Sequence, residues 1–468
     1  MSEMVVKNGS GQWQWAVSLR CNLVAASATR MLIRALLGSP FALMAITCNA
    51  QLTKAEVDAI PVIGTPGKVS ASYGSKSLRC PKANWLRIEA SGLYDSNALR
   101  NDLVLGLRRG DVLSDELRRN TQDGLKGNNR AGYALDFRAS YSWGDSLFGD
   151  GSLRPMISVA HHDVMGMRFT DDVYNLTFFG NTQYENETAS LSGTALTQVT
   201  YQTFGFGFQH AASNSFLRLE LVNGQRMNSA VLRQADLFTA TDGRFLHLDL
   251  DGSYARSDTA QYAFGTSNGI GLALSASVEK RISLLGTAAS VQLTVTDLGF
   301  IAWNGNAERI INNSTINYEG IEVENIFDLD GVVLDQAELQ DTIGLGYERG
   351  AFAQLLPTMV EARVQSGGHG KFCIAPARLY VWEIRIDQRN LPGYTPHLSI
   401  TKSFLGHHGL RPEIALSTGG FGGTRLGIGA QWNASPGLQV LLRVPNVIGP
   451  LATSGRGAAF TFGVDVAL

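Results

Sequence analysis

The sequence is poor in charge and has no excess of either sign. Charged residues make up 17% of its 468 positions, and the formal net charge at pH 7 is −2. Proteins that bind nucleic acid through its phosphates present a strongly basic field, so this balance gives no support for a nucleic-acid partner. Few charges together with 51 glycines fit an all-β chain, either soluble or with its strands in a low-dielectric environment.

The sequence also lacks an apolar run long enough for a membrane helix near its start. The apolar stretch 36–47 is shorter than the ~20 residues that a transmembrane helix needs. Arg34 precedes it and a small-x-small sequence ending at Ala50 follows, which gives the three parts of a secretory signal peptide. We therefore expect residues 31–50 to be a signal peptide cleaved after Ala50, and residues 1–30 to be an over-extended start.

Cysteine is scarce, with four in the whole chain. Cys48 lies at the expected cleavage region in a poor lipidation context, so a lipoprotein is the less favoured alternative. Only Cys80 and Cys373 would remain after cleavage, and in an oxidising periplasm they are as well able to pair as to stay free. Neither has a second ligand at metal-binding spacing, so no metal site is expected.

Long segments of alternating apolar and polar residues are abundant instead. Near the C-terminus, Phe460, Phe462 and Val464 alternate with Thr461 and Gly463, and the pattern recurs from about residue 130 onward. Successive side chains of a strand point to opposite faces. These runs of about 10 to 14 residues exceed the ~5–6 typical of soluble strands and suit the ~9–11 tilted residues that cross a bilayer. The pattern predicts an all-β fold, a transmembrane antiparallel outer-membrane β-barrel, apolar outside and polar inside.

The segments predict about 14 strands, within a range of 12 to 16, and an even number is usual for such barrels. The predicted strands are 130–143, 153–163, 196–209, 214–223, 244–256, 268–280, 288–301, 354–366, 376–387, 395–405, 409–420, 423–433, 436–445 and 457–468. The barrel would occupy residues 128–468. Residues 51–127 would form an N-terminal region or plug, within which 84–94 and 99–107 are either wall strands or plug. A lumen of this size must be plugged or form a pore.

Three segments interrupt the strand pattern. Residues 114–125 predict a short polar helix capped by Ser114, and residues 169–180 a second helix with Thr170 at its start. Residues 304–352 form a long acidic insert. Because acidic side chains are costly in lipid, we expect this insert to lie in the lumen or in water, and to control access to the pore.

Several motifs resemble a known family. "VTDLGFIAWNGNA" with "YEGIEVENIFD", "VYNLTFFGNTQYENETASLSG", "AFAQLLPTMVEARV" and "VIGPLATSGRGAAFTFGV" resemble a Bacteroidota outer-membrane β-barrel family known as a domain of unknown function (family 5723). The resemblance covers roughly residues 65–468. That family is similar to fatty-acid-transporter (FadL) barrels and to PorV-like accessory barrels of type IX secretion. The resemblance implies a fold and a location, without a chemistry.

The first of these motifs predicts a break in a wall strand. Asp297 and Gly299 would form a β-bulge, and Phe300 and Trp303 would reach the aromatic rim of the barrel. Four apolar side chains, each on a different predicted strand, are expected to face lipid: Leu248, Leu274, Leu293 and Ile428.

No catalytic constellation stands in a credible context. Ser267 lies in a G-x-S-x-G sequence, but a nucleophile elbow needs a helix after it, and a strand pattern follows here. The adjacent pairs His161-His162 and His407-His408 would point to opposite faces, so neither pair chelates one metal. We expect no enzyme, no catalytic residue, no metal and no cofactor.

Charged residues on the polar faces of the strands are the candidate functional residues. They would form either an internal salt-bridge network or a solute path, and Gly205 and Gly207 would leave room beside them. The candidates are Asp136, Arg138, Arg218, Glu220, Asp249, Asp251, Glu279, Glu361, Arg363, Glu383, Arg385, Glu413 and Arg425.

Two functions remain open at this point. One is a FadL-like channel or transporter for a hydrophobic or small solute. The other is an accessory or structural barrel that binds a secreted or periplasmic protein. Both place the chain in the Gram-negative outer membrane with lipid as its surroundings. A continuous apolar tunnel or a lateral opening in the wall would favour transport, whereas a sealed lumen with a large exposed extracellular patch would favour partner binding.

Overall fold

The computed structural model describes ten segments of the chain. They are residues 84–144, 152–211, 213–241, 245–258, 264–284, 286–318, 348–366, 380–435, 437–452 and 454–468. The expected signal peptide, Cys80, Cys373 and the middle of the acidic insert lie outside these residues.

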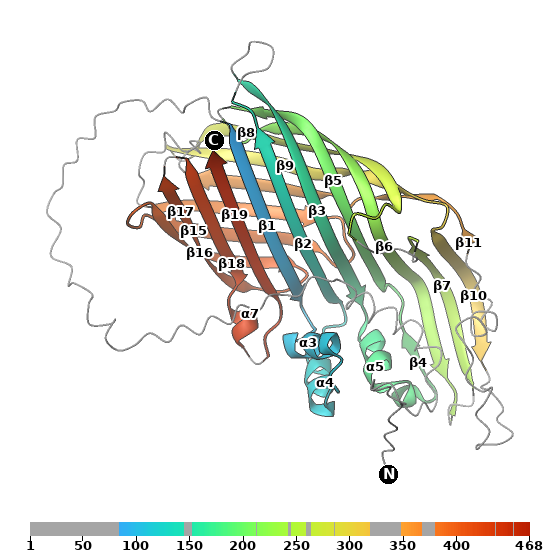
Figure 1. Cartoon of the computed structure of the whole chain (residues 1–468). Helices are drawn as coiled ribbons and strands as arrows, with labels where there is room; N and C mark the ends of the chain where they lie inside the picture. Colours follow the sequence, from blue (N-terminus) through green and yellow to red (C-terminus); the bar gives the residue numbers. More distant parts are fainter. Residues whose placement is uncertain are drawn as a thin grey trace, which may run out of the picture.

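The described residues form a closed antiparallel barrel of 14 wall strands (Figure 1). Strand β1 closes it, because its two edges pair with β2 and with the last strand, β19. In order around the ring, the wall strands are β1 (Trp85–Ser96), β2 (Asn129–Ser142), β3 (Leu153–Phe169), β5 (Ala195–His210), β6 (Phe216–Thr239), β8 (Gly269–Leu284), β9 (Thr287–Trp303), β12 (Phe352–Leu355) with β13 (Met359–Ser366), β14 (Tyr380–Arg389), β15 (Thr395–Phe404), β16 (Leu410–Gly420), β17 (Arg425–Ser435), β18 (Leu438–Asn446) and β19 (Ala458–Ala467).

The two ends of the barrel differ. At one end several connections are tight, since β8 and β9, and β17 and β18, follow each other almost directly. At the other end lie the helices α3 (Asn101–Arg109), α4 (Asp115–Gln122), α5 (Asp171–Phe179) and α7 (Ile448–Leu451), together with η2 (Thr182–Tyr184) (Figure 1). We call these the short-turn end and the long-loop end.

A second sheet extends from the wall at the long-loop end. The first half of β6 pairs with β8, whereas its second half pairs with β7 (Leu246–Arg256) and β4 (Glu187–Ser190). Strand β7 then pairs with β10 (Glu308–Tyr318), which pairs with the two residues of β11 (Glu348–Arg349). We call β4, β7, β10, β11 and this half of β6 the side sheet.

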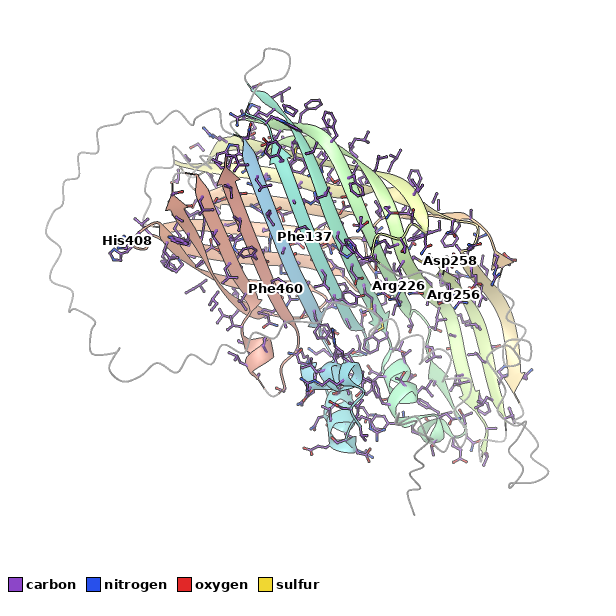
Figure 2. All side chains as sticks on the ribbon, viewed as in Figure 1. Phe137, Arg226, Arg256, Asp258, His408 and Phe460 are labelled. Carbon is purple, nitrogen blue, oxygen red and sulfur yellow. The ribbon has the colours of Figure 1, made fainter. Side chains whose placement is uncertain are left out.

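The outer face of the barrel is apolar, as predicted. Leu293 is 53% exposed, and Leu274 and Ile428 are also exposed. Phe137 and Phe460 point outward from neighbouring parts of the wall (Figure 2). Large apolar side chains that cover a surface in this way are suited to lipid.

The number of wall strands is right, but one of the individual assignments is not. Segment 84–94, which the sequence left open between wall and plug, belongs to β1 and is wall, because both its edges are paired. Segment 244–256, predicted as wall, is β7 of the side sheet. Its apolar face packs on α5: Leu248 contacts the cluster of Leu176 and Leu237. Leu248 therefore does not face lipid.

The two predicted helices, α4 and α5, are confirmed, and both have an N-cap of the predicted type. The Ser114 hydroxyl accepts a hydrogen bond from the Leu117 amide at 3.2 Å, and the Thr170 hydroxyl from the Val173 amide at 3.3 Å. Segment 99–107 is not a wall strand, because most of it lies in helix α3. This helix lies at the long-loop end of the barrel (Figure 1). Among the described helices, none is long and apolar enough to cross a membrane.

The predicted bulge is present and inverts the faces of β9. The register with β8 shifts between Leu274 and Ala276, and Asp297 has a φ of 58°. Phe300 is exposed on the outer face as expected, but Trp303 is only 1% exposed. The extra residue turns Trp303 inward, so it is not part of an aromatic rim.

Candidate functional site in the barrel lumen

A buried ionic network crosses the middle of the lumen. The Arg218 guanidinium donates to Glu220 at 2.7 Å, and Arg138 lies 3.9 Å from both Glu220 and Asp297. The Tyr201 hydroxyl donates to Asp297 at 3.2 Å. All of these side chains lie in low-dielectric surroundings, where charged groups persist only if they are paired.

The lumen is narrow enough for opposite walls to touch. Asp136 on β2 accepts a hydrogen bond from Arg389 at 3.3 Å, although β14 lies half-way round the ring of strands. His162 lies 2.6 Å from the other oxygen of Asp136 and stacks on Tyr201. These contacts join the two walls near the long-loop end.

Two turns close the mouth at the long-loop end. Turn 390–394 joins β14 to β15, turn 421–424 joins β16 to β17, and both fold into the lumen. Leu391 and Phe421 are buried against Ala134 and Val164 of the opposite wall. Arg130 donates to the Gly422 carbonyl at 3.2 Å.

Glycines on the opposite wall make room for these turns. A Cβ atom added to Gly166 would lie 2.6 Å from the Pro392 carbonyl oxygen and 2.8 Å from the Leu391 Cβ. A Cβ atom on Gly132 would clash with the Phe421 ring. The absent side chains are therefore required for the seal.

The rest of the mouth is filled by an apolar cluster. Trp303 and Ile301 pack with Met227, Val222 and Leu356 on the inner faces of the neighbouring strands. At the long-loop end, the two turns and this cluster both place side chains in the lumen. The described residues therefore show no continuous apolar tunnel through it.

A second ionic network lines the wall of β13 to β15. Arg363 donates to Glu361 at 2.8 Å and lies 4.0 Å from Glu383. Arg385 lies 3.9 Å from Glu361 and 3.6 Å from Asp387. Asp387 also accepts from the Tyr394 hydroxyl of the first mouth turn. The network thus connects the wall to the seal.

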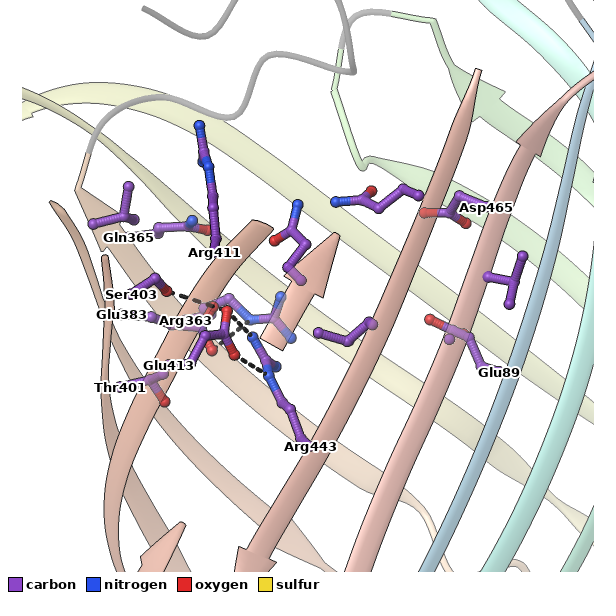
Figure 3. Close-up of a pocket in the computed structure, with 16 residues that line it drawn as sticks. Glu89, Arg363, Gln365, Glu383, Thr401, Ser403, Arg411, Glu413, Arg443 and Asp465 are labelled. Carbon is purple, nitrogen blue, oxygen red and sulfur yellow. Dashed lines mark hydrogen bonds and ion pairs between the residues drawn. The ribbon is translucent and has the colours of Figure 1, made fainter. Parts of the chain in front are cut away.

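Towards the short-turn end the lumen opens into a cavity of about 160 Å³ (Figure 3). Its lining is rich in polar side chains: Glu89, Arg363, Gln365, Glu383, Thr401, Ser403, Arg411, Glu413, Gln431, Gln439, Arg443 and Asp465. Glu89 is exposed although it faces the lumen, so water reaches the cavity.

Glycines also allow long side chains to pair across a strand in this part of the wall. Arg443 on β18 donates to Glu413 on β16 at 2.6 Å, passing over β17 at Gly429. A Cβ atom on Gly429 would lie 2.8 Å from Arg443 Cγ. In the same way, the room predicted beside Gly205 is taken by the stem of Arg218, whose Cδ would lie 2.5 Å from an added Cβ.

The structure brings most of the predicted lumen charges together. Asp136, Arg138, Arg218, Glu220, Glu361, Arg363, Glu383, Arg385 and Glu413 lie in the networks above, and Arg425 pairs with Asp95 near the mouth. Glu279 faces inward at the rim, where it accepts from the Asn214 amide at 2.7 Å.

Two predicted lumen residues are misplaced. Asp249 and Asp251 are on β7 of the side sheet, outside the wall. Asp251 accepts from Arg233 at 2.9 Å, and Asp249 from Thr315 at 2.7 Å. The prediction failed because a side sheet with one apolar face has the same alternation as a wall strand.

Some important lumen residues were missed. Arg389 continues the inward alternation of β14, but the predicted strand ended two residues earlier. Glu89 was missed because the sequence left its strand open between wall and plug. Arg411 and Arg443 lie on the inward faces of predicted strands, so the alternation alone could have identified them.

The rejected catalytic motif has no catalytic context in the structure either. Ser267 precedes strand β8, whereas the elbow would need a helix. His162 points into the lumen, and His161 points outward, with its ring 5.4 Å from that of Phe264.

The chain matches no protein-family model and no curated protein. Among solved structures, it is similar to the toluene transporter TodX of P. putida, at 8% identity and a TM-score of 0.34, covering 83% of this chain and 89% of that one. It is also similar to the translocator domain of the autotransporter NalP from Neisseria meningitidis, at 8% identity and a TM-score of 0.30, covering 82% and 89%. A Rh. blastica porin mutant is similar at 9% identity and a TM-score of 0.23, covering 82% and 99%. Likeness at this level does not identify a family, so membership of the Bacteroidota family stays a prediction.

Proposed function

We propose that this chain is an outer-membrane channel for a small polar solute, closed at one mouth in this structure. One observation carries the proposal. A water-accessible polar cavity occupies the short-turn side of the lumen, and turns 390–394 and 421–424 fold inward at the long-loop end. Because outer-membrane barrels have short periplasmic turns and longer extracellular loops, the cavity opens to the periplasm and the seal faces outside.

The polarity of the cavity supports a small polar solute rather than a hydrophobic one. A hydrophobic solute would need an apolar lining, because charged groups lose hydration when such a solute covers them. Here Arg363, Arg411 and Arg443 line the cavity together with four acidic residues. We propose no catalytic activity for it.

The test is to weaken the seal without touching the wall. The double substitution Leu391→Ser/Phe421→Ser removes the apolar contacts of both turns, and should raise single-channel conductance in planar bilayers. The control Leu451→Ser lies at the same end on α7, where the side chain is 80% exposed, and should leave conductance unchanged.

Heat-modifiable migration on a gel would verify that the double variant still forms a barrel. If the folded double variant conducts no more ions than the unsubstituted protein, the channel proposal is wrong. An accessory barrel that binds a secreted or periplasmic protein would then be the better hypothesis.

A further inference from the structure

Two of the charged groups that line the cavity have no ion pair. Glu413 is held by Arg443 and Ser403, Asp465 by Arg87, and Arg363 by Glu361. Within the described part of the chain, neither Arg411 nor Glu89 has a hydrogen bond or ion pair through its side chain. The two groups differ in sign and lie on opposite sides of the cavity (Figure 3).

Arg411 and Glu89 lie in one register row of the wall. Arg411 pairs with Gln431, Gln431 with Leu441, Leu441 with Gly463, and Gly463 with Glu89. Four steps of ~4.8 Å between strands place their backbones roughly 19 Å apart along the wall. The two side chains shorten this span from both ends.

The wall between these two groups leaves space for a solute. Gly463 has no side chain, and an added Cβ atom would have its nearest neighbour at 3.5 Å. Gln431 and Gln439 supply amide groups that both donate and accept hydrogen bonds. Apart from Leu441, the side chains along this part of the wall are polar, and the row ends in one charge of each sign.

The charges of the cavity nearly cancel, so it does not strongly favour a simple ion of either sign. Its lining has the acidic residues Glu89, Glu383, Glu413 and Asp465 and the basic residues Arg363, Arg411 and Arg443, and Arg87 balances Asp465 from the edge. An anion could pair with Arg411 but not with Glu89, while a cation would do the reverse. A solute with both charges, separated along its length, can pair with both groups.

From this we infer that the cavity binds a small zwitterion of about the size of a dipeptide, with its carboxylate at Arg411 and its ammonium at Glu89. The inference rests on the proposed channel function, since it names the class of solute that the channel admits.

Three probes that share the dialanine backbone test this inference. Dialanine is a zwitterion, dialanine amide is a cation, and N-acetyl-dialanine is an anion, all at pH 6.5. Uptake is measured in proteoliposomes that contain the Leu391→Ser/Phe421→Ser protein. We expect dialanine to enter at least fivefold faster than either of the other two probes.

Single substitutions separate the two binding groups. In this background, Arg411→Gln should slow dialanine and N-acetyl-dialanine but spare the amide, and Glu89→Gln should slow dialanine and the amide but spare the anion. Arg233→Gln, on the side sheet outside the wall, is the control and should change none of the three rates.

The possible failures are distinguishable. If small ions pass through the double variant but the three probes enter equally fast, or if neither substitution changes their order, the inference about the zwitterion is wrong and the channel remains. If no ion passes, the channel proposal itself fails.

Discussion

Arg389 and Asp136 join opposite walls of the barrel at an N–O distance of 3.3 Å. Arg389 is the last residue before turn 390–394. Asp136 is also bound by His162 at 2.6 Å. This contact makes the closed mouth part of the folded structure of the wall, since the turn cannot leave the lumen without displacing the arginine or bending the strand end.

Removing the arginine should therefore destabilise the closed barrel. Deleting one partner of a hydrogen bond below the protein surface typically costs about 1–3 kcal/mol, and Asp136 keeps its contact with His162. We expect Arg389→Met to lower the free energy of unfolding by about this much in urea titrations of the protein in lipid vesicles.

A double-mutant cycle checks the cause. Asp136→Asn/Arg389→Met no longer buries a carboxylate that lacks its arginine, so it should be more stable than Arg389→Met alone. If the two substitutions are simply additive, the contact across the lumen does not contribute as described.

Adding one carbon to a glycine should force the mouth open. Gly166→Ala would place a Cβ atom 2.6 Å from the Pro392 carbonyl oxygen and 2.8 Å from the Leu391 Cβ, so turn 390–394 must shift. We expect higher single-channel conductance for this variant. Gly463→Ala is the matched control, because its Cβ atom would have ordinary contact at 3.5 Å, and a similar rise in conductance there would contradict the model of the seal.

The wall could be predicted from the sequence because the alternation of apolar and polar residues is a local property. Predictions from this alternation failed at β7 and at Trp303. Strand β7 alternates like a wall strand, but whether its apolar face meets lipid or helix α5 depends on distant residues. Beyond Asp297 both faces of β9 are apolar, so the pattern does not show that the bulge turns Trp303 inward.

The mouth was less predictable than the wall. The contacts of Leu391 and Phe421 with the opposite wall join residues that are far apart in sequence. Gly132 and Gly166 are the local signal, since small residues on an inward face leave room for another chain segment. The sequence alone does not say which segment fills that room.

Neighbouring residues of β9 should respond very differently to the same substitution. Leu293 is on the lipid face, whereas Gln292 points inward and donates to Ser277 at 2.8 Å. An arginine near the midplane of a lipid face costs about 2–4 kcal/mol. Leu293→Arg should therefore reduce the free energy of unfolding in lipid vesicles far more than Gln292→Arg, and equal effects would show that the faces of this strand are assigned wrongly.

The side sheet should loosen at acid pH through Glu308. This residue links three strands in one row: its carboxylate accepts from Arg256 on β7 at 2.6 Å and from Arg349 on β11 at 3.0 Å. Burial opposes ionisation of Glu308, but the hydrogen bonds from the two arginines outweigh it and lower its pKa. A carboxyl group whose pKa is lower in the folded state stabilises that state above its unfolded pKa, and this stabilisation is lost as pH falls through the lowered value.

Amide hydrogen exchange of β10 and β11, corrected for intrinsic rates, should therefore accelerate on acidification below the ordinary glutamate range. Glu308→Gln should remove most of this pH dependence and exchange faster already at neutral pH. An unchanged pH profile in that variant would assign the acid sensitivity to other groups of the sheet.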